Sequence, residues 1–228
     1  LHDRNKFEIV ACSYGPLDSS SYCQSIRSHS DKWLNLTDLS DYEAALKIQE
    51  SGVQILVDLA GHTRNNRIAI MAYRPSLVQC LYMGYPATSG ADFIDYYLAD
   101  RKVLPEEHAE QFSEKIEYLD SYYHLVDESH PIGETISRAS QKLPEDSFVF
   151  SSFVATYKIT AQWFDLWLEI LLNCRNSVLW LGASNTFSQI NLIDRASQKG
   201  LADRIFFANR VPNKADHLAR LKLANLAL

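Results

Sequence analysis

The sequence predicts an α/β fold in which helices cover both faces of parallel sheets. Two observations carry this prediction. Short apolar runs, rich in β-branched and aromatic residues, recur along the chain at intervals that leave room for helices. Segments of helical composition lie between most of these runs. Strands that alternate with helices are typical of parallel sheets.

The apolar runs and the segments between them define the expected elements in order. Strands are expected at residues 7–14, 53–59, 78–83, 95–99, 115–119, 147–153, 177–182, 204–208 and 223–228. Helices are expected at about 19–29, 41–51, 105–112, 161–173, 187–200 and 214–223. Residue types at the boundaries support these limits. Thr160 can cap the helix that follows it, Pro105 suits a first helical turn, and Gly200 can end a helix in a left-handed turn.

A polar segment divides the chain. Residues 127–146 are rich in turn-forming residues and almost lack aromatic ones, as is typical of a linker. We therefore expect one α/β unit at 1–126 and a second at 147–228. The chain begins within a few residues of an expected strand and ends in LANLAL, which has the composition of an interior strand. We expect a piece of a longer protein in which both sheets are incomplete.

Composition excludes several classes of function. The formal charge is −6, and no run of Lys or Arg is longer than a pair, so binding to nucleic acid or to an anionic membrane is not expected. The sequence has no 18-residue apolar run and no signal-peptide layout at its start. The four cysteines lack CxxC spacing, which favours free thiols in a reducing compartment. We expect a cytoplasmic protein.

Motifs narrow the chemistry further. The sequence has no GxGxxG, no GxxxxGK[ST], no GxSxG and no HExxH. It also has no Asp-x-Asp pair, so we expect a site without a metal ion. Polar, turn-rich loops follow three expected strands, at 60–67, 84–90 and 154–158. Open α/β sheets bind ligands at this edge, and these loops suit a ligand with many hydroxyls or a phosphate.

Several motifs in series resemble one family. The run that contains DLAGHTRNNR, RPSLVQ, GYPATSG and QFSEK resembles the catalytic region of the O-linked N-acetylglucosamine transferase family, which includes SPINDLY-type proteins. The second unit continues the resemblance with FVATYKI, SVLWLG, GLADRIFF and HLARLKLAN. The likeness therefore covers nearly the whole chain.

The resemblance implies a fold and an activity. The fold would be of the GT-B type, with two Rossmann-like domains: an N-terminal catalytic lobe at 1–126 and a C-terminal lobe at 147–228 that holds the nucleotide sugar. The enzyme would move N-acetylglucosamine from UDP-GlcNAc to Ser or Thr hydroxyls of proteins, with inversion and without a metal or other cofactor. Tetratricopeptide repeats would precede the catalytic region in the full-length protein.

The resemblance also implies site residues. Lys158 matches a lysine that contacts the diphosphate, where its charge would stabilise the leaving group, so it is the expected catalytic residue. His217 and Arg220 match residues near the base and phosphates of the nucleotide. The expected residues near the sugar and the acceptor share two loops. They are Thr63, Met83, Gly84 and Pro86.

Departures from the family leave alternatives open. Ala155 stands where the family commonly has a glutamine near the nucleotide, so the donor could differ, for example GDP-fucose in a protein O-fucosyltransferase. The chain could instead be a non-catalytic scaffold. His62 is interpreted as a loop histidine with a structural hydrogen bond rather than as a base. The family's phosphate-binding segment would lie beyond Leu228, so residues 1–228 alone are expected to show weak activity or none.

Overall fold

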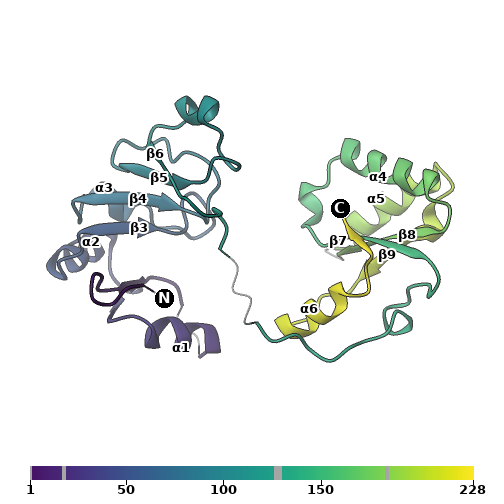
Figure 1. Ribbon diagram of the computed structural model, residues 1–228, viewed down its shortest axis with the longest axis horizontal. Coiled ribbons are helices and arrows are strands. Elements are labelled where there is room, and N and C mark those ends of the chain that lie inside the picture. The colour runs from purple at the N-terminus through teal and green to yellow at the C-terminus, as the bar shows by residue number, and fades with distance from the viewer. Residues whose placement is uncertain (1, 17–18, 126–129, 183–184) are drawn as a thin grey trace. The chain divides into compact units, whose positions relative to one another are not determined.

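A computed structural model describes residues 2–16, 19–125, 130–182 and 185–228 (Figure 1). These residues form two compact units, Leu1–Val126 and Asp127–Leu228. Among the residues so described, no helix is both long enough and apolar enough to cross a membrane.

The first unit contains a four-stranded parallel sheet in the order β3-β4-β5-β6. Its strands are β3 (Ile55–Asp58), β4 (Val78–Tyr82), β5 (Tyr96–Ala99) and β6 (Lys115–Tyr118). Leu81 pairs with Tyr97, and Tyr97 pairs with Ile116, so these side chains share one face. They pack with Met71 of the short helix α3 (Ala69–Ala72) in a buried cluster. All four strands therefore end at the same edge.

A second parallel pair joins β1 (Val10–Ser13) to β2 (Lys32–Asn35), with α1 (Ser21–Ser28) between them. Helix α2 (Asp41–Glu50) follows, and Ser40 and Glu43 form a capping box at its start. Ile48 of α2 packs against Leu36 and Ile70 in a separate buried cluster.

The second unit contains a four-stranded parallel sheet in the order β10-β7-β8-β9. Its strands are β7 (Phe148–Ser152), β8 (Ser177–Gly182), β9 (Ile205–Ala208) and β10 (Leu226–Ala227). Helices α4 (Ala161–Asn173) and α5 (Thr186–Ser197) cover one face (Figure 1). Leu143 belongs to the buried cluster on the other face, and Leu223 packs against it. After β9, helix α6 (Lys214–Leu221) returns the chain to the far side of β7. The strand order therefore reverses between β7 and β10, the position where open α/β sheets bind ligands.

Two expected helix boundaries are confirmed. The Thr160 hydroxyl accepts a hydrogen bond from the Trp163 amide at the start of α4. Gly200 has a φ of +68°, and the Leu201 amide bonds the Ala196 carbonyl at 3.0 Å beyond the end of α5. Local residue chemistry was enough to predict both boundaries.

Other elements differ from the expectation. The helix expected at 105–112 is the 3₁₀ helix η1 (Glu106–Gln111), which has no side-chain cap. The strand expected at 223–228 is reduced to β10, an edge strand with Leu226 51% exposed. The sequence did not predict β2, whose KWLN composition is half polar, or the four-residue helix α3.

The sequence predicts a linker at 127–146, but residues 130–146 are attached to the second unit's sheet. Leu143 is 4% exposed and belongs to the buried cluster around Val149. The Arg138 guanidinium donates to the carbonyl oxygens of Leu223 and Ser147, and 3₁₀ helix η2 (Ala139–Gln141) follows it. Several carbonyls can share one guanidinium because it carries five donors. Residues 127–129 lie outside the described residues.

Candidate active site

Two loops interlock at the carboxyl edge of the first unit's sheet. One follows β3, and the other follows β4. A Cβ added to Gly84 would lie 1.8 Å from the Leu59 carbonyl oxygen, and a Cβ on Gly61 would lie 2.4 Å from Tyr85 Cβ. Each loop therefore needs a glycine where it touches the other. The closest approach at Gly84 is to protein backbone.

Met83 begins the second loop in a left-handed conformation, with φ of 65°. This conformation costs a residue other than glycine about 1–3 kcal/mol, so the surroundings must enforce it. The side chain is half-buried and packs against the core cluster of Leu81 and Tyr97. Met83 and Gly84 therefore occupy a constrained turn at the sheet edge, as a rigid binding wall requires.

Asp58 and His62 brace this edge. The Asp58 carboxylate ends β3 and accepts a hydrogen bond from the Gly61 amide at 2.5 Å. Burial raises the pKa of Asp58 above its usual value, against the opposing effect of that hydrogen bond. His62 Nε2 lies 2.8 Å from the Ser89 carbonyl oxygen, and its ring meets the Tyr85 ring edge-on at 5.2 Å. The structural hydrogen bond expected of His62 is therefore present, and its exclusion as a base stays a prediction.

Thr63 and Pro86 lie on the same two loops. The Thr63 hydroxyl donates to the Ala60 carbonyl oxygen at 2.8 Å within its own turn, and the residue is exposed. Pro86 lines a hollow of about 240 Å³ together with Tyr97, Leu104 and other residues of the β5–β6 connection. The structure thus places Thr63, Met83, Gly84 and Pro86 at one sheet edge, and their roles toward a sugar stay predictions.

Sequence reasoning missed Glu114, which lies just before β6 and is 4% exposed. Its carboxylate accepts hydrogen bonds from the Thr88 hydroxyl at 2.7 Å, from the Ser89 amide at 2.7 Å and from the Ser89 hydroxyl. The GYPATSG and QFSEK motifs are therefore joined in space. The presence of both motifs in one sequence was the only signal of this contact, and it did not show which atoms meet.

Lys158 lies in the loop that follows β7 in the second unit, at the end of 3₁₀ helix η3 (Thr156–Lys158). It is exposed, and its Nζ lies 5.9 Å from the centroid of the Tyr157 ring. Among the described residues no carboxylate forms an ion pair with it. A cation at the carboxyl end of β7 that pairs with no described carboxylate is available to an anionic ligand.

His217 and Arg220 meet at the same edge of this sheet. Arg220 is 6% exposed, and its guanidinium carbon lies 4.7 Å from the centroid of the Phe153 ring that follows β7. Its Nη1 donates to the Asn209 carbonyl oxygen, at 2.5 Å, beyond the end of β9. The Phe153 ring also meets the His217 ring edge-on at 5.5 Å. Arg220 therefore ties α6 to the loops after β7 and β9.

The hydrogen bond between these two side chains fixes the state of His217. Arg220 Nε donates to His217 Nδ1 at 2.9 Å, so Nδ1 carries no proton. Burial and the neighbouring Arg220 charge both lower the pKa of His217. The imidazole is therefore neutral at neutral pH, and its proton lies on Nε2, where it can donate to a ligand.

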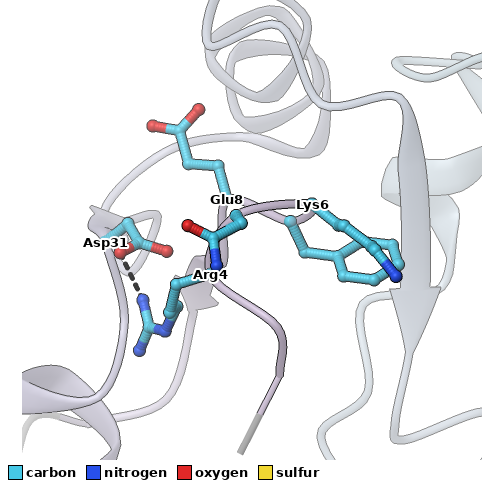
Figure 2. Close-up of a pocket in the computed structure, with 6 residues that line it drawn as sticks. Arg4, Lys6, Glu8 and Asp31 are labelled. Carbon is cyan, nitrogen blue, oxygen red and sulfur yellow. Dashed lines mark hydrogen bonds and ion pairs between the residues drawn. The ribbon is translucent and has the colours of Figure 1, made fainter.

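Another hollow lies away from these residues. It has a volume of about 370 Å³ and is lined by Arg4, Asn5, Lys6, Phe7, Glu8 and Asp31. Figure 2 shows Arg4 paired with Asp31, with Glu8 and Lys6 pointing elsewhere. This hollow lies at the amino end of β1 and contains none of the predicted site residues. Among the described residues no group of three His, Cys, Asp or Glu side chains could hold a metal ion.

Similarity to known proteins agrees with a glycosyltransferase. The chain is 31% identical over its whole length to a probable UDP-N-acetylglucosamine–peptide N-acetylglucosaminyltransferase, SEC, of Arabidopsis thaliana. It is 24% identical over its whole length to the UDP-N-acetylglucosamine–peptide N-acetylglucosaminyltransferase of Caenorhabditis elegans. The sequence profile of glycosyl transferase family 41 matches residues 1–135 and 129–228. The chain belongs to this family.

A solved structure confirms the fold class. A lysine-to-methionine mutant of the Thermobaculum terrenum O-GlcNAc transferase matches 99% of this chain with a TM-score of 0.86 and 25% identity. The predicted α/β fold of the GT-B type, with two units built on parallel sheets, is therefore correct. The chain spans 43% of that solved chain, 24% of the Arabidopsis protein and 30% of the Caenorhabditis protein.

Proposed function

We propose that this chain is part of a glycosyltransferase that moves N-acetylglucosamine from UDP-GlcNAc to Ser or Thr hydroxyls of peptides. The observation that carries the proposal is the family match over the whole chain, together with relatives whose names specify this donor and a peptide acceptor. The exposed cation at Lys158 and the neutral donor at His217 agree with an anionic nucleotide ligand.

The proposed reaction is an inverting displacement. The acceptor hydroxyl oxygen forms a bond to the anomeric carbon of the sugar, while the bond from that carbon to the diphosphate oxygen breaks. The diphosphate leaves with the electron pair, and the acceptor proton passes to a base. Lys158 would stabilise the charge that grows on the diphosphate, a role that a metal ion fills in other enzymes. No separate cofactor is then needed.

The other predicted residues would hold the donor. The His217 Nε2 proton and the rigid Arg220 would lie beside the nucleotide, at the edge where the strand order reverses. Met83 and Gly84 would border the sugar, and Thr63 the sugar and acceptor. A cytoplasmic location would agree with four free cysteines, because thiols stay reduced in the cytosol.

Donor binding tests this proposal against its closest alternative. UDP-GlcNAc should raise the melting temperature of the intact protein, since a ligand that binds the folded state stabilises it. The intact protein should also add N-acetylhexosamine to a Ser- or Thr-containing peptide, detected by mass spectrometry. If GDP-fucose raised the melting temperature and UDP-GlcNAc did not, the donor would be GDP-fucose instead of UDP-GlcNAc. Absence of binding and transfer with either donor would favour a scaffold, which the substitution at Ala155 suggests.

A further inference from the structure

Glu114 is a buried carboxylate that neutral hydrogen-bond donors hold. It is 4% exposed, and no Lys or Arg of the described ranges forms an ion pair with it. Three neutral donors hold it instead: the Thr88 hydroxyl, the Ser89 hydroxyl and the Ser89 amide. A buried charge is costly unless hydrogen bonds compensate it, so this arrangement is specific to one loop conformation.

The hydroxyls that hold Glu114 have no freedom to turn away. Thr88 Oγ1 donates to Glu114 and accepts from the Gly90 and Ser113 amides, each at 3.1 Å. Ser89 Oγ donates to Glu114 and accepts from the Ala91 amide at 3.2 Å. Burial raises the pKa of Glu114, but the hydrogen bonds from Ser89 and Thr88 have the larger opposite effect. The pKa is therefore below its usual value. The ionised carboxylate therefore orients both hydroxyls.

The same loop carries the predicted sugar contacts. Ser89 donates two hydrogen bonds to Glu114, from its amide and its hydroxyl. The Ser89 carbonyl oxygen lies 2.8 Å from His62 Nε2. His62 packs on Tyr85, which directly follows Gly84. Hydrogen bonds and ring contacts thus run from Glu114 through the loop to the strained turn at Met83.

We propose that Glu114 is a positioning residue for the donor sugar. By fixing Thr88 and Ser89, it holds residues 83–90, and with them Met83 and Gly84, in the conformation that borders the sugar. The statement about the sugar rests on the proposed function, whereas the statement about the loop does not. Two readouts can therefore separate the claims.

The variant Glu114→Gln tests the proposal in the intact protein. Glutamine has nearly the same shape, but one carboxylate oxygen is replaced by an NH₂ group. This group cannot accept the hydrogen bond that the wild-type oxygen accepts, most directly the one from the Thr88 hydroxyl. We expect the KM for UDP-GlcNAc to rise about tenfold and kcat/KM to fall about 10- to 100-fold, because small misplacements of binding groups are costly. The KM for the acceptor peptide should change less than the KM for the donor. Glu117→Gln, at an exposed glutamate of β6 three residues further along the chain, is the matched control.

A milder variant and a second readout cover the case of misfolding. Ser89→Ala removes one hydroxyl donor, and the double variant should be no worse than Glu114→Gln if Glu114 acts through Ser89. Amide hydrogen exchange over residues 83–90 should become about tenfold faster in Glu114→Gln. Unchanged exchange and unchanged donor KM in both variants would overturn the proposal. Faster exchange in a protein whose wild type binds no UDP-GlcNAc would support the loop claim and refute the proposed function.

Discussion

Gly84→Ala tests the interlocked loops most sharply. The backbone of Gly84 needs no left-handed conformation, so the cost of the change comes from contact alone. The new Cβ would lie 1.8 Å from the Leu59 carbonyl oxygen and 2.8 Å from its carbon. Because an ordinary C···O contact is about 3.3 Å, the two loops must separate by about 1.5 Å. Overpacking of this kind costs about 1–3 kcal/mol.

Two other glycines provide controls. Gly90 has a φ of +68° with nothing within 4 Å of an added Cβ, so Gly90→Ala isolates backbone strain. Gly15 also has open space and no such φ, so Gly15→Ala should be nearly neutral. Thermal unfolding and calorimetric titration of UDP-GlcNAc would measure stability and donor affinity. We expect Gly84→Ala to lower the melting temperature by about 2–12 °C and to weaken donor binding at least tenfold. Stability and affinity equal to those of Gly15→Ala would refute the close contact.

Two further predictions concern the second unit. Arg220→Lys should destabilise the protein by about 1–3 kcal/mol, because lysine cannot keep the hydrogen bonds to His217 and Asn209 together with the stacking on Phe153, and chemical denaturation would measure the loss. An unchanged free energy of unfolding would contradict this role. The pKa of His217 is lowered in the folded state, so the unfolded state binds the proton first and stability should fall as the pH drops below about 6.5. Melting temperatures at several pH values should show this fall, and its full persistence in His217→Gln would exclude His217 as the cause.

The sequence was informative where structure depends on local chemistry. The cap at Thr160 and the left-handed Gly200 follow from the preferences of single residues. The strand-end loops could be predicted because buried parallel strands are apolar runs with polar ends. Contacts between distant segments could not be predicted in this way. The close approach of Gly84 to Leu59 and the hydrogen bond of Ser89 to Glu114 leave no local pattern in the sequence. Each contact depends on which strands become neighbours.

The predicted site residues divide in the same manner. Motif resemblance selected His217 and Arg220, but their hydrogen bond and the burial of Arg220 emerge only from the packing of α6 on Phe153. Residues 130–146 have the composition of a linker, yet Arg138 and Leu143 attach them to the second sheet. Composition describes average behaviour, and two well-placed side chains outweigh it.

Under the proposed function, Lys158 serves catalysis of glycosyl transfer. The direct test is the rate at which the intact protein transfers N-acetylglucosamine from UDP-GlcNAc to a peptide, compared between the wild type, Lys158→Ala and Lys222→Ala. Lys222, an exposed lysine at the end of α6, controls for the loss of a positive charge. We predict that Lys158→Ala lowers kcat by about 100- to 1000-fold, as expected for loss of a charge that stabilises the leaving group, while Lys222→Ala stays near wild type. A kcat for Lys158→Ala within twofold of the wild type would contradict a catalytic role for Lys158.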